Sequence, residues 1–178
     1  MKHLQRRVLH FFEPFAGERG LHLMRMIRRT ERQVLPISAA DAWRFFSQPK
    51  NLQKITPTSM GFTPLTGDSE PVYSGQILTY KISPLFGWPM RWTTEIVHVE
   101  EGVYFVDNQL SGPYALWHHL HRFEAKGPNA VEITDVLHYA LPGGIFGHFL
   151  IGWWVKRQVD AIFAFRAERL RTLFPKAD

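Results

Sequence analysis

Apolar and polar side chains alternate along much of this chain, which is the pattern of β-strands that bury one face. Turn residues such as Gly67-Asp68, Glu101-Gly102 and Gly127-Pro128-Asn129 separate the alternating runs. We expect strands at about residues 27–35, 58–65, 73–83, 88–100, 103–111, 114–126 and 130–141. Because the connections between them are short, neighbouring strands should be antiparallel.

Helical periodicity flanks and interrupts this series of strands. Ser38 is a good N-cap for a short helix over residues 39–47, and residues 51–55 predict a second helical turn. Residues 146–174 predict a long C-terminal helix. Its repeating face consists of Phe149, Trp153, Val159, Ile162, Phe163, Arg166, Leu170 and Leu173. Its apolar first half is too short to cross a bilayer, so we expect a buried helix lying across a curved sheet.

Two strands hinged at Ser111-Gly112-Pro113 carry polar side chains on a face that should point inward. Because strand side chains alternate, Phe105, Asp107 and Gln109 share one face of the first strand. The corresponding face of the second strand consists of Trp117, His119, His121 and Phe123. The aromatic residues indicate an inward face, where an unpaired polar group costs about 1–3 kcal/mol. We therefore expect a wet or ligand-filled cavity here.

Asp135 and Arg166 extend this polar set. Asp135 is the single carboxylate on the apolar face of the strand over residues 130–141, a face that also holds Tyr139. A histidine of the neighbouring strand should pair with it, since facing side chains of adjacent strands lie within reach of each other. Arg166 falls on the helix face that meets the sheet. It either pairs with Asp135 or Asp107 or keeps its head in water at the cavity rim.

Three roles for this histidine–aspartate network stay open. It can lock the strand register, or it can bind the polar end of a ligand whose apolar body lies against Trp92 and Trp117. It can also act as an acid/base pair in cyclisation or dehydration of a polyketide-like substrate, with His119, His121 and Asp135 as catalytic candidates. The same three side chains could hold a metal, but a clear further ligand is lacking. We expect no metal and no cofactor.

Charge is unevenly distributed along the 178 residues, although the net charge is only +5. Residues 1–32 hold eight of the 21 basic and three of the 16 acidic side chains, which leaves 13 of each sign for the rest. A basic face for nucleic acid is therefore not indicated. The absence of cysteine excludes disulfides and thiolate metal sites and agrees with a cytoplasmic location.

The leading segment, residues 1–23, differs from the remainder of the chain. It lacks the long apolar run of a signal peptide, and no transmembrane segment is expected anywhere in the sequence. We expect an extension of uncertain order. A short basic amphipathic helix that touches a membrane surface is the alternative.

Several short motifs, in the order strand, two short helices, antiparallel strands and long helix, are shared with a known superfamily. They are Phe46-x-x-Pro49-x-Asn51-Leu52, Ile55-Thr56-Pro57, Gly75-x-Ile77, Tyr80, Trp92-x-Thr94-x-Ile96, Phe105-x-Asp107-x-Gln109-x-x-Gly112-Pro113, Trp117-x-His119-x-His121-x-Phe123, Asp135, Tyr139, Pro142 and Ile162-Phe163-x-x-Arg166. In these the chain resembles the START-like superfamily, which includes polyketide cyclase/dehydrase-like and Bet v 1-like proteins, and in particular its bacterial ligand-binding branch. The resemblance implies an α+β helix-grip fold. A curved antiparallel sheet of six to seven strands would wrap around a long C-terminal helix, with two short helices after the first strand and an elongated cavity for an apolar or amphipathic molecule.

We therefore expect one START-like ligand-binding domain over residues 24–178, which binds or also carries a small hydrophobic or amphipathic molecule. The expected ligand contacts are Trp92, Asp107, Gln109, Trp117, His119, His121, Phe123, Asp135, Tyr139, Phe163 and Arg166. A cyclase/dehydrase-type enzyme that uses a His–Asp pair and a regulatory protein-interaction module are the alternatives.

Overall fold

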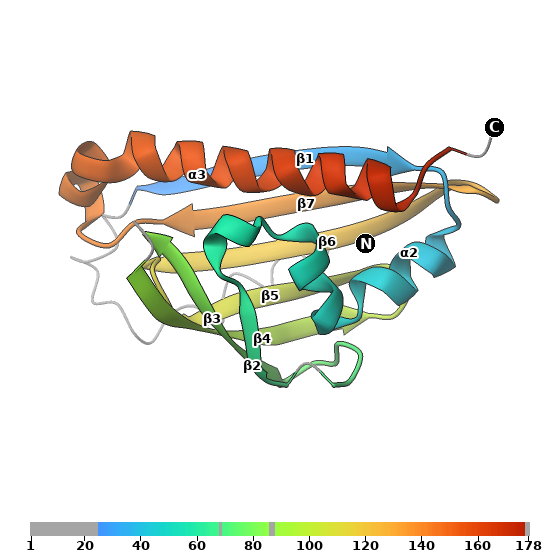
Figure 1. The fold of residues 1–178 in the computed structure, drawn as a ribbon, viewed down its shortest axis with the longest axis horizontal. Helices are drawn as coiled ribbons and strands as arrows, with labels where there is room; N and C mark the ends of the chain where they lie inside the picture. Colours follow the sequence, from blue (N-terminus) through green and yellow to red (C-terminus); the bar gives the residue numbers. More distant parts are fainter. Residues whose placement is uncertain (1–24, 68, 86–87, 177–178) are drawn as a thin grey trace, which may run out of the picture.

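A seven-stranded antiparallel sheet and a long helix dominate the computed structural model, which describes residues 25–67, 69–85 and 88–176 (Figure 1). The elements are β1 (Met26–Leu35), α2 (Ala39–Phe46), the 3₁₀ helices η2 (Pro49–Ile55) and η3 (Thr58–Met60), β2 (Thr63–Thr66), β3 (Gln76–Leu85), β4 (Trp88–Glu100), β5 (Tyr104–Ser111), β6 (Leu116–Gly127), β7 (Ala130–Ala140) and α3 (Gly144–Leu173). The strand order is β1-β7-β6-β5-β4-β3-β2. This α+β helix-grip arrangement confirms the predicted fold class.

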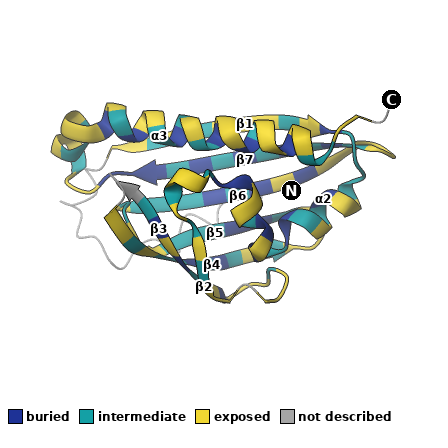
Figure 2. Cartoon of the chain, in the orientation of Figure 1, coloured by how far each residue is buried: buried dark blue, intermediate teal, exposed yellow. Residues whose placement is uncertain are grey.

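The chain reverses direction between β7 and α3 at two glycines. Gly143 and Gly144 have φ angles of 79° and 57°, a left-handed conformation that side chains with a Cβ rarely adopt. After this turn α3 runs along the sheet beside β1 and β7 (Figure 1). Buried positions recur along its second half, from Val155 through Phe163 to Leu170, while its first turns are largely exposed (Figure 2).

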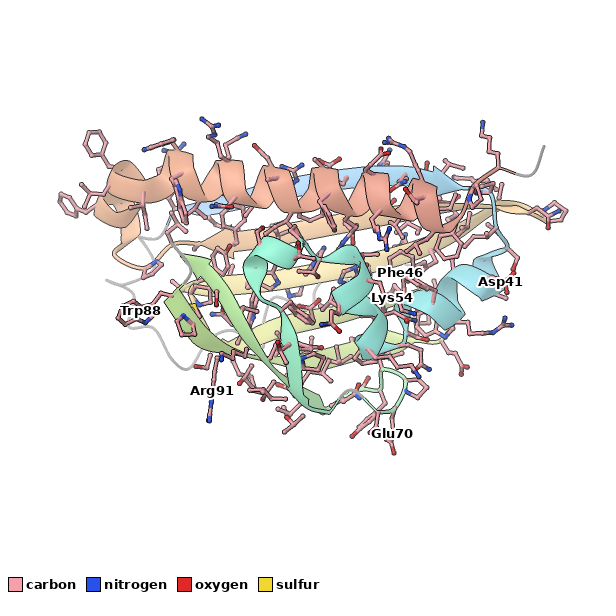
Figure 3. The ribbon with its side chains drawn as sticks, in the orientation of Figure 1. Asp41, Phe46, Lys54, Glu70, Trp88 and Arg91 are labelled. Carbon is pink, nitrogen blue, oxygen red and sulfur yellow. The ribbon has the colours of Figure 1, made fainter. Side chains whose placement is uncertain are left out.

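Helix α2 covers the far end of the sheet. Ser38 caps it as predicted, because its Oγ accepts a hydrogen bond of 3.1 Å from the backbone N–H of Asp41. Asp41 is exposed, whereas Phe46 points inward and is 8% exposed (Figure 3). The helix therefore presents one apolar face to the sheet.

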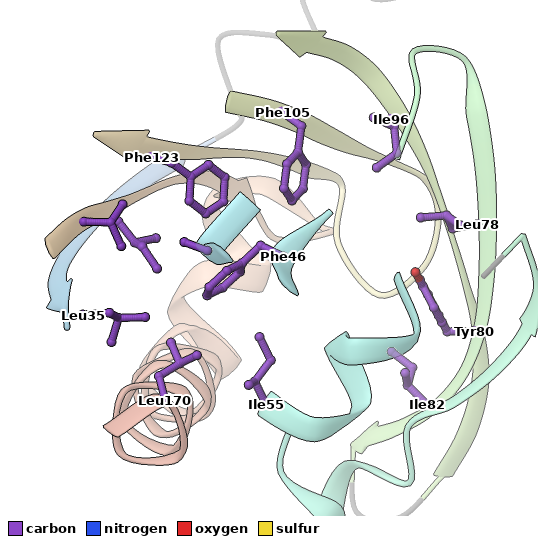
Figure 4. Packing of buried hydrophobic residues seen from close by; sticks show 13 residues of the cluster. Leu35, Phe46, Ile55, Leu78, Tyr80, Ile82, Ile96, Phe105, Phe123 and Leu170 are labelled. Atoms are coloured by element: carbon purple, nitrogen blue, oxygen red, sulfur yellow. The ribbon is translucent and has the colours of Figure 1, made fainter. Parts of the chain in front are cut away.

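Two apolar clusters form the core. The larger one joins α2, η2 and the end of α3 to the sheet, and Phe46, Phe105 and Phe123 pack their rings together within it (Figure 4). The smaller cluster joins β7 to the middle of α3, through residues such as Leu137 and Val159. Each cluster fixes one part of α3 against the sheet.

The structure departs from the sequence-based expectations in two places. Residues 58–60 form the 3₁₀ helix η3, so the second strand is only Thr63–Thr66. The first turns of α3 are largely exposed: Phe149 is 85% and Trp153 is 64% exposed. The prediction of a buried helix across the sheet is confirmed for Val155 to Leu170 and wrong for the first turns, because apolar residues continue past the part of α3 that the sheet and the other helices cover.

Residues 1–24 lie outside the described part of the chain, so the expectations for the leading segment are not addressed by the structure. Within residues 25–176, apart from the gaps at 68 and 86–87, no helix combines the length and hydropathy that crossing a membrane requires.

Candidate ligand-binding site

A cavity of about 140 Å³ lies between the 3₁₀ helices, the inner face of the sheet and α3. Its lining is mostly apolar and consists of Phe45, Phe46, Gln48, Pro49, Leu52, Ile55, Thr56, Met60, Phe62, Val72, Leu78, Tyr80, Trp92, Thr94, Ile96, Phe105, Asp107, Trp117, His119, His121, Ile162 and Arg166. Four ionisable side chains of this lining, Asp107, His119, His121 and Arg166, lie together. With Asp135, which contacts the two histidines and Arg166 from behind, they are termed the polar floor. An apolar cavity with a few convergent polar groups is the usual form of a small-molecule site.

Strand register brings the polar floor together. Asp107 on β5 lies opposite His119 on β6, and His121 on β6 lies opposite Asp135 on β7. Since alternate strand residues share a face, all four side chains point to the same side of the sheet. The sequence predicted these neighbours, and the pairing observed between β5, β6 and β7 makes them adjacent.

The two histidines lie between the two aspartates. His121 Nε2 is 3.1 Å from Asp107 Oδ2, and His121 Nδ1 is 2.7 Å from Asp135 Oδ1. His119 Nε2 is 3.2 Å from the same Asp135 Oδ1, and His119 Nδ1 is 3.9 Å from Asp107 Oδ2. Of these contacts only that of His121 with Asp107 has the geometry of a hydrogen bond. The others are close but out of line with the N–H direction.

Arg166 reaches the floor from α3. Its terminal nitrogen is 3.5 Å from Asp135 Oδ2, and its guanidinium lies 5.5 Å from the ring centroid of Phe163. Both Arg166 and Asp135 are at most 9% exposed. Of the alternatives that the sequence left open for Arg166, the structure has the pairing with Asp135, and this pair joins α3 to β7 beneath the cavity.

The electrostatics of this group follow from burial and from mutual attraction. Burial alone would raise the pKa of Asp135, but Arg166 and His121 hold that pKa well below its usual value. Burial lowers the pKa of His119 to about 4, which favours its neutral form. Burial would also lower the pKa of His121, but Asp135 and Asp107 reverse the effect and raise it. The floor thus combines two carboxylates, Asp107 and Asp135, with Arg166, a histidine of lowered pKa and a histidine of raised pKa.

Several buried polar atoms around the cavity lack a hydrogen-bond partner among the described residues. They are Trp92 Nε1, His119 Nε2, His121 Nδ1, Asp135 Oδ1 and Arg166 Nε. Most buried polar groups in proteins are paired, so such a concentration at one site calls for a physical reason. His119 Nε2 and His121 Nδ1 lie 3.2 Å and 2.7 Å from Asp135 Oδ1, so small rotations of the two rings would pair these three atoms with one another.

Six of the predicted contact residues line the cavity and five do not. The six are Trp92, Asp107, Trp117, His119, His121 and Arg166. Asp135 lies behind the histidines, and Gln109 instead binds the backbone of Tyr114 with both ends of its amide. The other three pack in the core or against α3: Phe123, Tyr139 and Phe163.

The opposite wall was not assigned to the site from the sequence. Leu52 from η2, Met60 from η3 and Phe62 just beyond it close the cavity across from the polar floor. The signal that could have revealed them is the recurrence of apolar residues in a segment too irregular to be a helix or strand of its own.

No protein-family model matches the sequence, and no curated protein matches it. Among solved structures, norcoclaurine synthase from Thalictrum flavum, in complex with dopamine and hydroxybenzaldehyde, superposes with a TM-score of 0.63. That match covers 93% of this chain and 96% of the other at 15% identity. The chain has the Bet v 1-like, START-like helix-grip fold.

Two further structures share the helix-grip fold. The protein TTHA0849 from Thermus thermophilus matches with a TM-score of 0.58 and 16% identity, over 83% of this chain and 99% of that one. The di-domain ARO/CYC protein BexL matches with a TM-score of 0.60 and 13% identity, over 82% of this chain and 46% of that one. At these identities the similarity establishes the helix-grip fold, which ligand-binding and cyclase-type proteins share.

Proposed function

We propose that the protein binds a small, largely apolar molecule with one polar end, the polar end lying on Asp107, His119 and His121. The observation that carries this proposal is the apolar cavity with a single polar floor. A cavity of about 150 Å³ lined by apolar side chains is known to hold benzene. At about 140 Å³ the present cavity has room for one aromatic ring. A longer lipid would require the wall formed by η2 and η3 to move.

The solved structures agree with a ligand of this size. Norcoclaurine synthase was solved with dopamine and hydroxybenzaldehyde, which are single rings that carry polar substituents. Trp92 and Trp117 line the cavity with their rings 4.9 Å apart in an edge-to-face contact, a surface against which a flat ring can pack. A hydroxylated single-ring aromatic is therefore the ligand class that we propose.

An acid/base enzyme of cyclase/dehydrase type is the second candidate. The observation in its favour is that His119 and His121 separate the cavity from Asp135, as a catalytic base is held by an orienting carboxylate. BexL, which is named an ARO/CYC protein, has the same fold. A regulatory protein-interaction module and a cytoplasmic location remain predictions from the sequence.

Calorimetric titration with phenol, catechol and 4-hydroxybenzaldehyde, compared with toluene, tests the proposed function. We expect the oxygen-bearing rings to bind more tightly, because toluene leaves the polar floor unpaired. The matched variants are Leu78→Phe and Leu137→Phe, since both leucines are at most 3% exposed and only Leu78 lines the cavity. Leu78→Phe should abolish binding, and Leu137→Phe should retain it if folded. Equal binding by both variants would place the ligand elsewhere, and turnover of an offered substrate would favour the enzyme.

A further inference from the structure

Three metal-binding groups converge on the polar floor. Asp107, His119 and His121 can each direct one ligand atom to a common point, and these atoms lie within 4.8 Å of one another. Ligand atoms held at about 2.0–2.2 Å by one tetrahedral ion stand roughly 3.3–3.6 Å apart. Asp107 Oδ2 is 3.1 Å from His121 Nε2 and 3.9 Å from His119 Nδ1. Side-chain shifts of less than about 1 Å would give the coordination distances.

The other nitrogen of each imidazole faces a second carboxylate. His119 Nε2 and His121 Nδ1 lie 3.2 Å and 2.7 Å from Asp135 Oδ1, and Arg166 lies beyond Asp135. Histidines that bind metals almost always donate their second N–H to a carboxylate, carbonyl or water, which fixes the orientation of the ring. Asp135 Oδ1 is close enough to both rings for this role, and small ring rotations would bring the two N–H groups into line with it. Arg166 contacts Asp135 and none of the three ligand atoms.

We propose that Asp107, His119 and His121 bind one divalent transition-metal ion, Zn²⁺ or Fe²⁺, with Asp135 as the residue that orients both histidines. All three ligands line the cavity, so the remaining coordination position faces the space proposed for the organic ligand. Three protein ligands with an open position are typical of catalytic zinc, and two histidines with one carboxylate are typical of non-haem iron. The two aspartates offset the charge of the ion.

This inference replaces the expectation that the protein binds no metal. The sequence alone suggested Asp135 as a third ligand and left the set incomplete. In the structure Asp107 lies with the two histidines at the cavity, and Asp135 lies behind them. The proposal uses the same cavity as the proposed function but does not depend on any organic ligand.

The test uses the full chain, freed of metal by a chelator and then titrated with Zn²⁺ alone, with anaerobic Fe²⁺, and with Co²⁺ as a spectroscopic probe. We expect one ion per chain and the visible absorption of coordinated Co²⁺. Asp107→Asn and His119→Ala should abolish stoichiometric binding, while Asp135→Asn should weaken it about 10–100-fold. His118→Ala is the control, because His118 lies on the opposite face and contacts Asn108.

X-ray absorption of the zinc-loaded wild-type protein keeps the test independent of how the variants fold. Two imidazole ligands in its spectrum support the site, and a spectrum without imidazole overturns it. Absence of stoichiometric binding by any of the three ions also overturns it, as does unchanged binding by Asp107→Asn. None of these results bears on whether phenol binds to the metal-free protein, so the two proposals can fail separately.

A second inference rests on a different part of the molecule, the exposed apolar stripe at the start of α3. Phe146, Phe149, Leu150 and Trp153 follow one another along this stripe and are 64–85% exposed. The stripe continues into the exposed cations Lys156 and Arg157. Exposed apolar patches of this kind mark interaction surfaces.

Among the described residues, three segments at this end of the molecule carry no acidic side chain. No Asp or Glu occurs in residues 82–94, 108–123 or 136–159, which include the strand ends and the first turns of α3 at this edge. Trp88, which is 74% exposed, and Arg91 project from the first residues of β4 (Figure 3). Lys156 is paired with Asp160 at 2.8 Å, so its charge is partly compensated. Aromatic rings beside exposed cations fit an anionic lipid surface, to which each cation adds about 1 kcal/mol of attraction.

We infer that this end docks on an anionic membrane surface. A small cavity of about 50 Å³ opens beneath the stripe, lined by Ile151, Trp154 and Val155, and it shares Trp92 and Ile162 with the main cavity. Docking would therefore place the membrane next to the end of the ligand site. An amphipathic ligand could enter from the lipid without crossing water.

Vesicle flotation tests this second proposal, with phosphatidylcholine alone and with about a third phosphatidylglycerol. We expect binding to the anionic vesicles only, and at least a tenfold loss in the double variant Phe149→Glu/Trp153→Glu. Val34→Glu is the control, because Val34 is 57% exposed at the other end of β1. Failure of the wild type to float, or equal flotation of the double variant, would overturn the proposal. Light scattering that shows a dimer split by the double variant would assign the stripe to self-association instead.

Discussion

Replacing Arg166 with methionine should destabilise the protein through Asp135. The two side chains are buried and 3.5 Å apart, which corresponds to on the order of 5 kcal/mol of Coulomb attraction at an effective dielectric constant of about 20. Removing one partner of a buried pair usually costs about 3–5 kcal/mol, because the other charge is left uncompensated. His119 and His121 still contact Asp135, so we expect Arg166→Met to cost about 3 kcal/mol.

Denaturant unfolding in a double-mutant cycle measures this effect. Asp135→Asn removes the charge that Arg166 compensates, so Arg166→Met should cost no more than about 1 kcal/mol in that background. Arg171→Met is the control on the same helix, since the Arg171–Glu168 pair is 66% and 71% exposed and should contribute about 0–1 kcal/mol. If Arg166→Met lowers the free energy of unfolding by the same amount in the wild-type and the Asp135→Asn backgrounds, the two charges do not interact. The electrostatic description of the polar floor would then be wrong.

Three smaller predictions test how the elements are held. Leu170→Ala should cost about 2–5 kcal/mol in denaturant unfolding, because Leu170 is 2% exposed, while Leu150→Ala on the same helix, 71% exposed, should change stability by less than about 0.5 kcal/mol. Ser38→Ala should cost about 1 kcal/mol, measured in the same way, because it removes the N-cap of α2. Gln109→Ala should raise the hydrogen-exchange rate of the Tyr114 amide at least tenfold, since the Gln109 amide bonds both backbone groups of that residue.

Much of the fold was predictable because strand alternation and turn residues are local signals. The inward faces of β5, β6 and β7 followed directly from alternation, and the buried Asp135 confirms that reasoning. The end of burial along α3 was not predictable in this way. Phe149 and Val159 are both apolar and both fit the helical spacing, yet one is 85% and the other 1% exposed. Only the extent of the neighbouring elements separates them, and that is a tertiary property.

The candidate site shows the same division between local and tertiary information. Alternation identified Asp107, His119 and His121 as inward groups, but it could not show whether Asp107 or Asp135 reaches the cavity. That depends on the position of each strand in the sheet: β5 and β6 face the cavity, whereas α3 covers β7 at this point. Gln109 does not line the cavity for a related reason, since its amide turns to the adjacent backbone of Tyr114.

The same atom of an organic ligand would interact with the polar floor under both proposals. A ring oxygen substituent can exchange hydrogen bonds with Asp107 and the histidines of the metal-free protein, and it can equally complete the coordination of an ion held by them. A preference for phenol over toluene therefore supports the cavity without distinguishing the two. The discriminating quantity is the difference in phenol affinity between metal-free and metal-loaded protein. If the two phenol affinities are equal, phenol does not contact the ion. The open coordination position then does not face the part of the cavity in which the phenol ring binds.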